Sequence, residues 1–193
     1  MECGKRYFQT YSGIIIYFDD ILTEDKIKLQ DIAHSLSLLC RFNGQCKHFY
    51  SVGEHSINCL KIADSLGYDD DLKLYTLLHD ASEAYLGDVV TPLKKQLIEY
   101  KMYEKSFQNV IFKRFGLSDA NKEIENKLKI VDNACFELEW AKLMKPDSSS
   151  ITSDDLVFYE RNSTEVENDF ITRAKMLIKT DKFWVKIYAE LVT

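Results

Sequence analysis

Two hydrophobic periods along the chain predict a short β segment followed by a helical body. Residues 7–10 and 14–18 are rich in β-branched and aromatic side chains and flank Ser12-Gly13, which is typical of a β-hairpin. After Thr23 the apolar residues recur at three- and four-residue steps, which places them on one face of a helix. In this first helix they are Leu29, Ile32, Ala33, Leu36, Leu39 and Cys40. We expect the hairpin to cover the core of a helical protein.

Capping signals predict where the next two helices begin and end. Ser51 and Glu54 fit a capping box, so a second helix starts there and carries His55. A third apolar stripe begins near residue 71 and continues to Gly87, which can end a helix in a left-handed conformation. This third helix is expected to carry His79, Asp80 and Glu83.

Two longer helices are predicted in the second half of the chain. Thr91 is a cap candidate that precedes a first-turn proline, Pro92, and its helix is expected to reach about residue 115. Ser118 is the cap candidate of the next helix. This helix carries Asp132 and cannot continue far beyond Pro146.

The C-terminal third completes a single domain. Residues 147–155 are predicted to form a loop, and residues 165–191 contain enough apolar positions for two closing helices. A chain of 193 residues can bury one sizeable core but has little room for a second. Residues 1–193 are therefore expected to form one all-α domain, a compact helical bundle with a short N-terminal β-hairpin.

Composition narrows the partners and the compartment. The chain has 31 acidic against 25 basic residues, so its formal charge of −6 disfavours stable binding to duplex nucleic acid. Its five cysteines are scattered and form no C-x-x-C pair, which argues against a disulfide framework and favours a reducing cytoplasm. No apolar stretch is long enough to span a bilayer, so we expect no association with a membrane.

The candidate chemistry begins with the adjacent pair His79-Asp80. Two titratable groups inside an apolar helix are costly to bury unless something binds them, although an isolated pair of this kind more often has a structural role. The case strengthens with His55 on its own capped helix and Asp132 on the apolar stripe of another, because polar groups facing a core need partners. Mixed imidazole and carboxylate ligands suit manganese, iron, cobalt, nickel or zinc, whereas oxygen ligands alone suit magnesium or calcium. These four residues are therefore candidate metal ligands.

The ordered pattern H…HD…D formed by these residues resembles the HD-domain phosphohydrolase superfamily over roughly residues 31–141. Three longer motifs are similar to its small 5′-deoxynucleotidase-like branch of bacteria and phages: SVGEHS at 51–56, HDASEA at 79–84 and GDVVTPLK at 87–94. The resemblance implies a helical bundle that forms a homodimer or a higher homo-oligomer. It also implies one divalent transition metal, with magnesium as the alternative, held by His55, His79, Asp80 and Asp132.

The resemblance assigns roles to three further residues. Glu83 and Asp88 match the acidic pair that supports attack by water in this branch, and Arg41 matches its phosphate-binding arginine. An arginine offers a planar fork of donors that fits a phosphate, although an arginine in a solvated loop would look the same in the sequence.

Three further positions, Phe42, Thr91 and Lys94, bear on sugar preference and on substrate contact, and the sequence does not decide either. Phe42 departs from the branch, whose deoxynucleotidases commonly have a tryptophan after the arginine that contacts the sugar. Thr91 and Lys94 follow the Gly-Asp loop and are candidates for substrate contact, yet a helix cap and a solvated first-turn lysine explain them equally well.

The leading hypothesis is hydrolysis of a 5′-(deoxy)nucleoside monophosphate to a nucleoside and orthophosphate by attack of a metal-bound water. The nearest rival is removal of triphosphate from a deoxynucleoside triphosphate on the same scaffold. A rival of another class is a nucleotide-binding protein that retains the fold without turnover. Such a protein is expected in the cytoplasm of a bacterium, or of the host if a phage encodes it.

Overall fold

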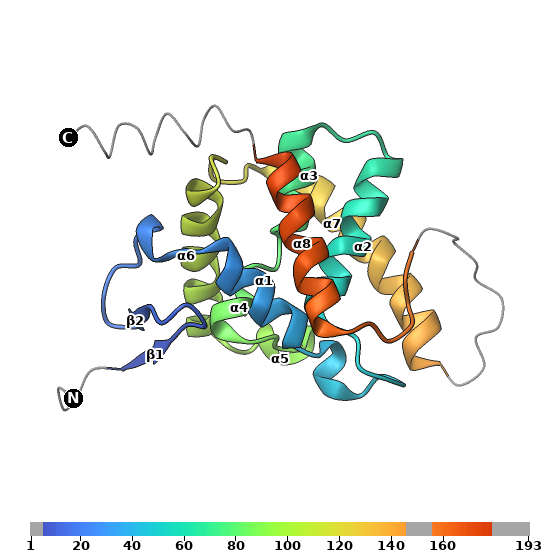
Figure 1. Cartoon of the computed structure of the whole chain (residues 1–193), viewed down its shortest axis with the longest axis horizontal. Coiled ribbons are helices and arrows are strands. Elements are labelled where there is room, and N and C mark those ends of the chain that lie inside the picture. Colours follow the sequence, from blue (N-terminus) through green and yellow to red (C-terminus); the bar gives the residue numbers. More distant parts are fainter. Residues whose placement is uncertain (1–5, 146–155, 179–193) are drawn as a thin grey trace.

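The computed structural model describes residues 6–145 and 156–178, and these residues form helices together with one small sheet (Figure 1). The prediction of an all-α fold with an N-terminal hairpin is confirmed. In chain order the elements are β1 (Tyr7–Gln9), β2 (Ile15–Tyr17), a 3-10 turn (Glu24–Lys26), α1 (Leu29–Leu38), a second 3-10 turn (Arg41–Gly44), α2 (Val52–Ser65), α3 (Asp70–Leu77), α4 (Glu83–Leu86), α5 (Thr91–Lys94), α6 (Ile98–Arg114), α7 (Lys122–Glu139), a π-helical turn (Trp140–Met144) and α8 (Ser163–Leu177).

The hairpin closes one side of the core. β1 and β2 pair antiparallel with Phe8 opposite Ile16, and the side chain of Ile16 is buried. The turn is fixed to α1, because Asp31 accepts hydrogen bonds from the backbone N–H and the hydroxyl of Ser12 at 2.7 and 2.8 Å. The first helix starts at Leu29, after a 3-10 turn at residues 24–26.

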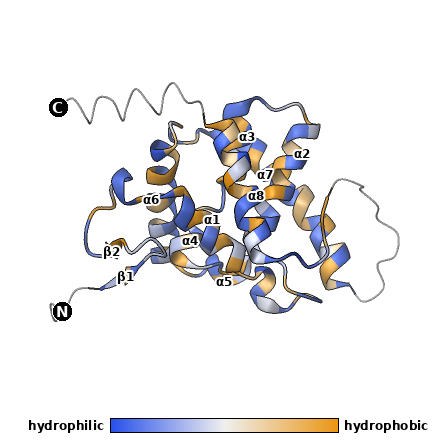
Figure 2. Cartoon of the chain, viewed as in Figure 1, coloured by the Kyte–Doolittle hydropathy of each residue, from blue (hydrophilic) through white to orange (hydrophobic). Residues whose placement is uncertain are grey.

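Helices α1, α2 and α8 meet at the centre of the molecule. α8 packs along α1 and also contacts α2 and α3, as its central place in Figure 1 suggests. The close approach depends on Gly53, because a Cβ there would lie 3.0 Å from Val166 and 3.3 Å from the backbone of Leu36. Figure 2 shows hydrophobic and hydrophilic residues alternating along these helices, as amphipathic helices around a shared core require.

The helix predicted from residue 71 to Gly87 is interrupted, and that prediction is wrong at its middle. α3 ends at Leu77. Backbone hydrogen bonds between residues three apart follow: Ala81 N–H donates to Leu78 O, and Glu83 N–H donates to Asp80 O, each at 3.0 Å. This tighter turn winds the chain differently from an α-helix. Gly87, with φ of 82°, ends α4 as predicted.

The helix predicted from Thr91 to residue 115 is two helices, α5 and α6, separated by a turn at residues 95–97. Val90, not Thr91, occupies the N-cap of α5, although Pro92 lies in the first turn as expected. The cap of α7 is Asn121 rather than Ser118.

Of the two predicted closing helices, α8 is described. The second one and the loop at residues 147–155 lie outside the described residues. None of the described helices combines the length and apolar character that crossing a membrane requires.

Candidate metal centre

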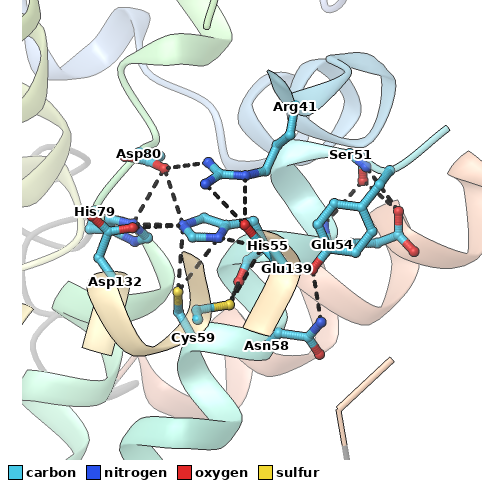
Figure 3. A network of polar contacts seen from close by, with 12 residues as sticks. Arg41, Ser51, Glu54, His55, Asn58, Cys59, His79, Asp80, Asp132 and Glu139 are labelled. Atoms are coloured by element: carbon cyan, nitrogen blue, oxygen red, sulfur yellow. Dashed lines mark hydrogen bonds and ion pairs between the residues drawn. The ribbon is translucent and has the colours of Figure 1, made fainter. Parts of the chain in front are cut away.

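Four side chains from three separate segments converge on one point (Figure 3). His55 comes from α2, His79 and Asp80 from the turn after α3, and Asp132 from α7. The Nε2 atoms of the two histidines are 3.3 Å apart. An Asp132 oxygen lies 3.3 Å from His55 Nε2, and an Asp80 oxygen lies 3.3 Å from His79 Nε2. The two remaining histidine to aspartate distances are 3.6 and 3.9 Å.

These separations fit a shared metal ion. Ligand atoms held tetrahedrally at about 2.0–2.1 Å from a metal lie roughly 3.3 Å from one another. Packing alone does not explain why two imidazoles face each other and two carboxylates. Partly buried polar and charged groups are costly unless something binds them. The donor set of two nitrogens and two carboxylates therefore fits a metal in both distance and chemistry.

The second nitrogen of each histidine supports this orientation. His55 Nδ1 lies 2.7 Å from an oxygen of Glu139, and His79 Nδ1 lies 2.7 Å from the backbone oxygen of Thr76. Each Nδ1–H can donate to its oxygen, which leaves each Nε2 lone pair directed at the cluster. Metal-binding histidines are usually held by such a hydrogen bond.

A thiol lies beside the cluster and widens the set of possible ligands. Ligand atoms of His55, Cys59, His79 and Asp132 all lie within 4.8 Å of one another. The sulfur of Cys59 is 3.5 Å from Nε2 and 3.9 Å from Nδ1 of His55. Cys59 is therefore a further candidate ligand beside the two histidines and the two aspartates.

The cluster is closed on one side and open on the other. The side chain of His55 is fully buried, whereas that of Asp80 is 22% exposed and that of Asp132 is 43% exposed. Burial opposes ionisation of Asp132, but the two histidines outweigh it and hold the pKa of this carboxyl well below its usual value. A ligand from solvent can therefore reach the cluster from the Asp132 side.

Arg41 lies next to the cluster and is held by a residue that the sequence did not reveal. Its Nε and Nη2 atoms lie 3.2 and 3.1 Å from Glu139, and its Nη1 lies 3.7 Å from Asp80. Glu139 has no exposed surface. Burial would raise the pKa of Glu139, but the neighbouring His55 and Arg41 lower it to about 2. Glu139 is thus an anion that lies between the cluster of candidate metal ligands and Arg41.

The predicted acidic pair, Glu83 and Asp88, lies close enough to Asp80 to interact with it electrostatically. Burial raises the pKa of the Glu83 carboxyl well above its usual value, and the charges of Asp80 and Asp88 raise it further. Burial also raises the pKa of Asp88, against the opposing effect of Arg41. Lys94 lies 3.0 Å from Glu83, so it is not a solvated first-turn residue.

Lys94 is further restrained by Glu104, which lies 2.6 Å from its Nζ. Thr91 is exposed at the start of α5. It is not the N-cap of that helix, so the interpretation as a helix cap does not hold. Both residues stay predictions as substrate contacts.

Phe42 begins an aromatic surface beside Arg41. It adopts a left-handed backbone with φ of 55°, which is strained for a residue with a bulky side chain. Its ring lies 6.0 Å from that of Phe136 and 6.2 Å from that of Trp140, and these two are 5.7 Å apart. Phe136 on α7 and Trp140 at the start of the π-helical turn follow Asp132 at four-residue steps. The aromatic surface therefore extends along the helix, away from the candidate metal ligands.

The fold and the site together define an all-helical protein with a cluster of histidine, aspartate and cysteine side chains that could hold a metal ion. No protein-family model matches the chain. Over 111 residues it is 40% identical to the uncharacterized protein YfdR of Escherichia coli, and the match covers 58% of this chain and 59% of that protein. Over 119 residues it is 34% identical to an uncharacterized protein of Rhodobacter capsulatus, covering 58% of this chain and 61% of that protein. The chain thus matches less than two thirds of either relative's length, and neither name states a function.

Proposed function

We propose that this chain is a metal-dependent phosphohydrolase of the HD type that converts a 5′-nucleoside monophosphate into a nucleoside and orthophosphate. The observation that carries the proposal is the convergence of His55, His79, Asp80 and Asp132 beside Arg41. A divalent transition metal suits this donor set better than magnesium, because two of the four donors are imidazole nitrogens. When bound there, the metal would lower the pKa of a coordinated water and offset the charge that develops on a phosphoryl oxygen.

Arg41 is suited to bind the phosphate. Its guanidinium is largely buried, its Nε and Nη2 are fixed by Glu139, and its Nη1 faces the cluster at Asp80. A guanidinium held in this way pays little conformational entropy when it meets an anion, and its planar donors fit two phosphate oxygens. The substrate phosphate is therefore expected to lie between Arg41 and the metal site.

Glu83 is suited to move the proton. As the water oxygen forms its bond to phosphorus, a base must take a proton from it, and the bond between phosphorus and the nucleoside oxygen breaks. A carboxyl whose pKa is raised well above its usual value by burial binds a proton more readily than an ordinary glutamate, so it can accept that proton and return it. Asp88 shares this acidic environment and is the second candidate for proton transfer to the leaving oxygen.

The aromatic surface formed by Phe42, Phe136 and Trp140 is suited to the nucleoside. Four residues of α-helix rise about 6 Å, so Phe136 and Trp140 lie about one and two turns beyond Asp132. A nucleoside monophosphate bound at the metal site would extend its sugar and base over this distance. Aromatic rings stack on bases without strong selection among them.

A product assay on the purified chain tests the proposal. Nucleoside mono- and triphosphates would be incubated with manganese, cobalt, nickel, zinc or magnesium, and the products resolved chromatographically. We expect orthophosphate and a nucleoside from monophosphates, with a transition metal required. Release of intact tripolyphosphate would favour the triphosphohydrolase instead, and nucleotide binding without turnover in any condition would contradict both.

A further inference from the structure

The two oxygens of one buried carboxylate serve two different functional groups. Oε1 of Glu139 lies 2.7 Å from Nδ1 of His55, while Oε2 lies 3.2 and 3.1 Å from Nε and Nη2 of Arg41. Figure 3 shows Glu139 between the imidazole and the guanidinium. The sulfur of Cys135 adds a contact to Oε1 at 3.4 Å. Among the described residues, Glu139 is the carboxylate that contacts both Nδ1 of a candidate metal ligand and the candidate phosphate-binding arginine.

Each of these contacts fixes an orientation that the site needs. The bond to His55 places its proton on Nδ1 and leaves Nε2 as the lone pair that faces the cluster. The bonds to Arg41 occupy Nε and Nη2 and direct Nη1 toward Asp80. Since Glu139 has no exposed surface, bulk water does not compete for either contact.

We propose that Glu139 is a positioning residue that holds a metal ligand and the phosphate-binding arginine with one carboxylate, so that metal affinity and phosphate affinity depend on the same side chain. The inference rests on the proposed function for the roles of His55 and Arg41. Glu139 itself contacts neither the metal nor the substrate in this arrangement: 2.7 Å to Nδ1 is a hydrogen-bond length, and Nδ1 faces away from the cluster.

The substitution Glu139→Gln separates positioning from general packing, because the amide has nearly the same shape as the carboxylate. In either orientation of the amide its NH2 group faces an N–H donor, so one contact is lost, and the remaining oxygen is uncharged, so the other contact is weakened as well. We expect metal affinity to fall about 10- to 100-fold, as for other residues that orient a metal ligand. We also expect weaker binding of inorganic phosphate by the metal-loaded protein and a higher KM for nucleoside monophosphates.

The matched control is Glu137→Gln, which makes the same chemical change at an exposed position two residues earlier on α7. It should leave all three quantities unchanged. Zinc or cobalt affinity would be measured by competition with a chromophoric chelator, and phosphate affinity by calorimetry, with circular dichroism to show that each variant is folded. Both affinities are obtained without turnover, so they report on Glu139 even if no nucleotide is hydrolysed.

Two results would overturn the inference. One is a folded Glu139→Gln protein that binds metal and phosphate as the wild type does and loses only thermal stability. The other is a loss of one affinity without the other. If Glu139→Gln does not fold, Glu139→Asp provides the test, because it keeps the charge but withdraws it by one methylene, and wild-type affinities in that variant would equally contradict the proposal.

Discussion

At the scale of single residues, the most informative group is the carboxyl of Glu83. One of its oxygens accepts from Lys94 at 3.0 Å, and the other is buried without a hydrogen-bond partner among the described residues. An unpartnered buried oxygen is costly and is seldom kept for stability alone. Together with the raised pKa, this oxygen supports the proposed role of Glu83 in proton transfer.

The substitution Glu83→Gln should therefore separate metal binding from catalysis. Because Glu83 is not among the four ligands, the variant should keep the metal content of the wild type, while kcat falls about 10²- to 10⁴-fold through loss of the proton acceptor. Asp80→Asn should lose both metal and activity. Metal analysis by mass spectrometry beside a phosphate-release assay checks this. Equal metal content and equal activity in the two variants would show that the roles are wrongly assigned.

At the scale of elements, the site depends on where helices begin and stop. α2 starts at the capping box of Ser51 and Glu54, which the sequence predicts and the structure confirms, and this fixes the position of His55. The break after α3 turns His79 and Asp80 toward the cluster. α7 supplies Asp132, and its start is held by Asn121, whose side chain accepts from two backbone N–H groups at 3.0 Å.

The exposed cap of α7 gives a prediction on stability. Asn121→Ala should lower the free energy of unfolding by about 1 kcal/mol, because two N–H groups in the first turn lose their side-chain acceptor and are left to bond with water. Asn121→Asp keeps an acceptor and adds a charge that the helix N-terminus favours, so it should be neutral or slightly stabilising. Urea unfolding followed by circular dichroism measures both. A loss of the same size in both variants would show that the amide, not the cap, is important there.

At the scale of the whole molecule, the sequence predicts the candidate ligands better than their surroundings. The convergence of His55, His79, Asp80 and Asp132 could be predicted because these donor types interrupt apolar stripes, as the ligands of a metal would. Glu139 lies seven residues after Asp132 on the same helix face, a spacing that could have indicated it. In the sequence, however, it looks like any solvated glutamate, and its burial arises only when Arg41 and His55 arrive from 98 and 84 residues away.

The helix boundaries that the sequence missed have a similar cause. The apolar stripe around His79 continues through the break, so periodicity alone could not reveal the change from α-helix to tight turns. Ser118 and Asn121 are both good cap residues, and the choice between them depends on packing. In the folded protein the backbone oxygen of Ser118 accepts a hydrogen bond from Tyr75 at 2.9 Å, which leaves Asn121 to begin the helix.

A crystal structure of the metal-loaded protein would show whether the four candidate ligands, which come from distant segments of the sequence, bind one ion. Diffraction data collected on both sides of the absorption edge of zinc or cobalt would locate the ion. We predict one anomalous peak about 2.0–2.2 Å from His55 Nε2, His79 Nε2 and the carboxylates of Asp80 and Asp132. The absence of a peak there at saturating metal, or a peak held instead by His55 Nδ1, Cys135 and Glu139, would contradict the account.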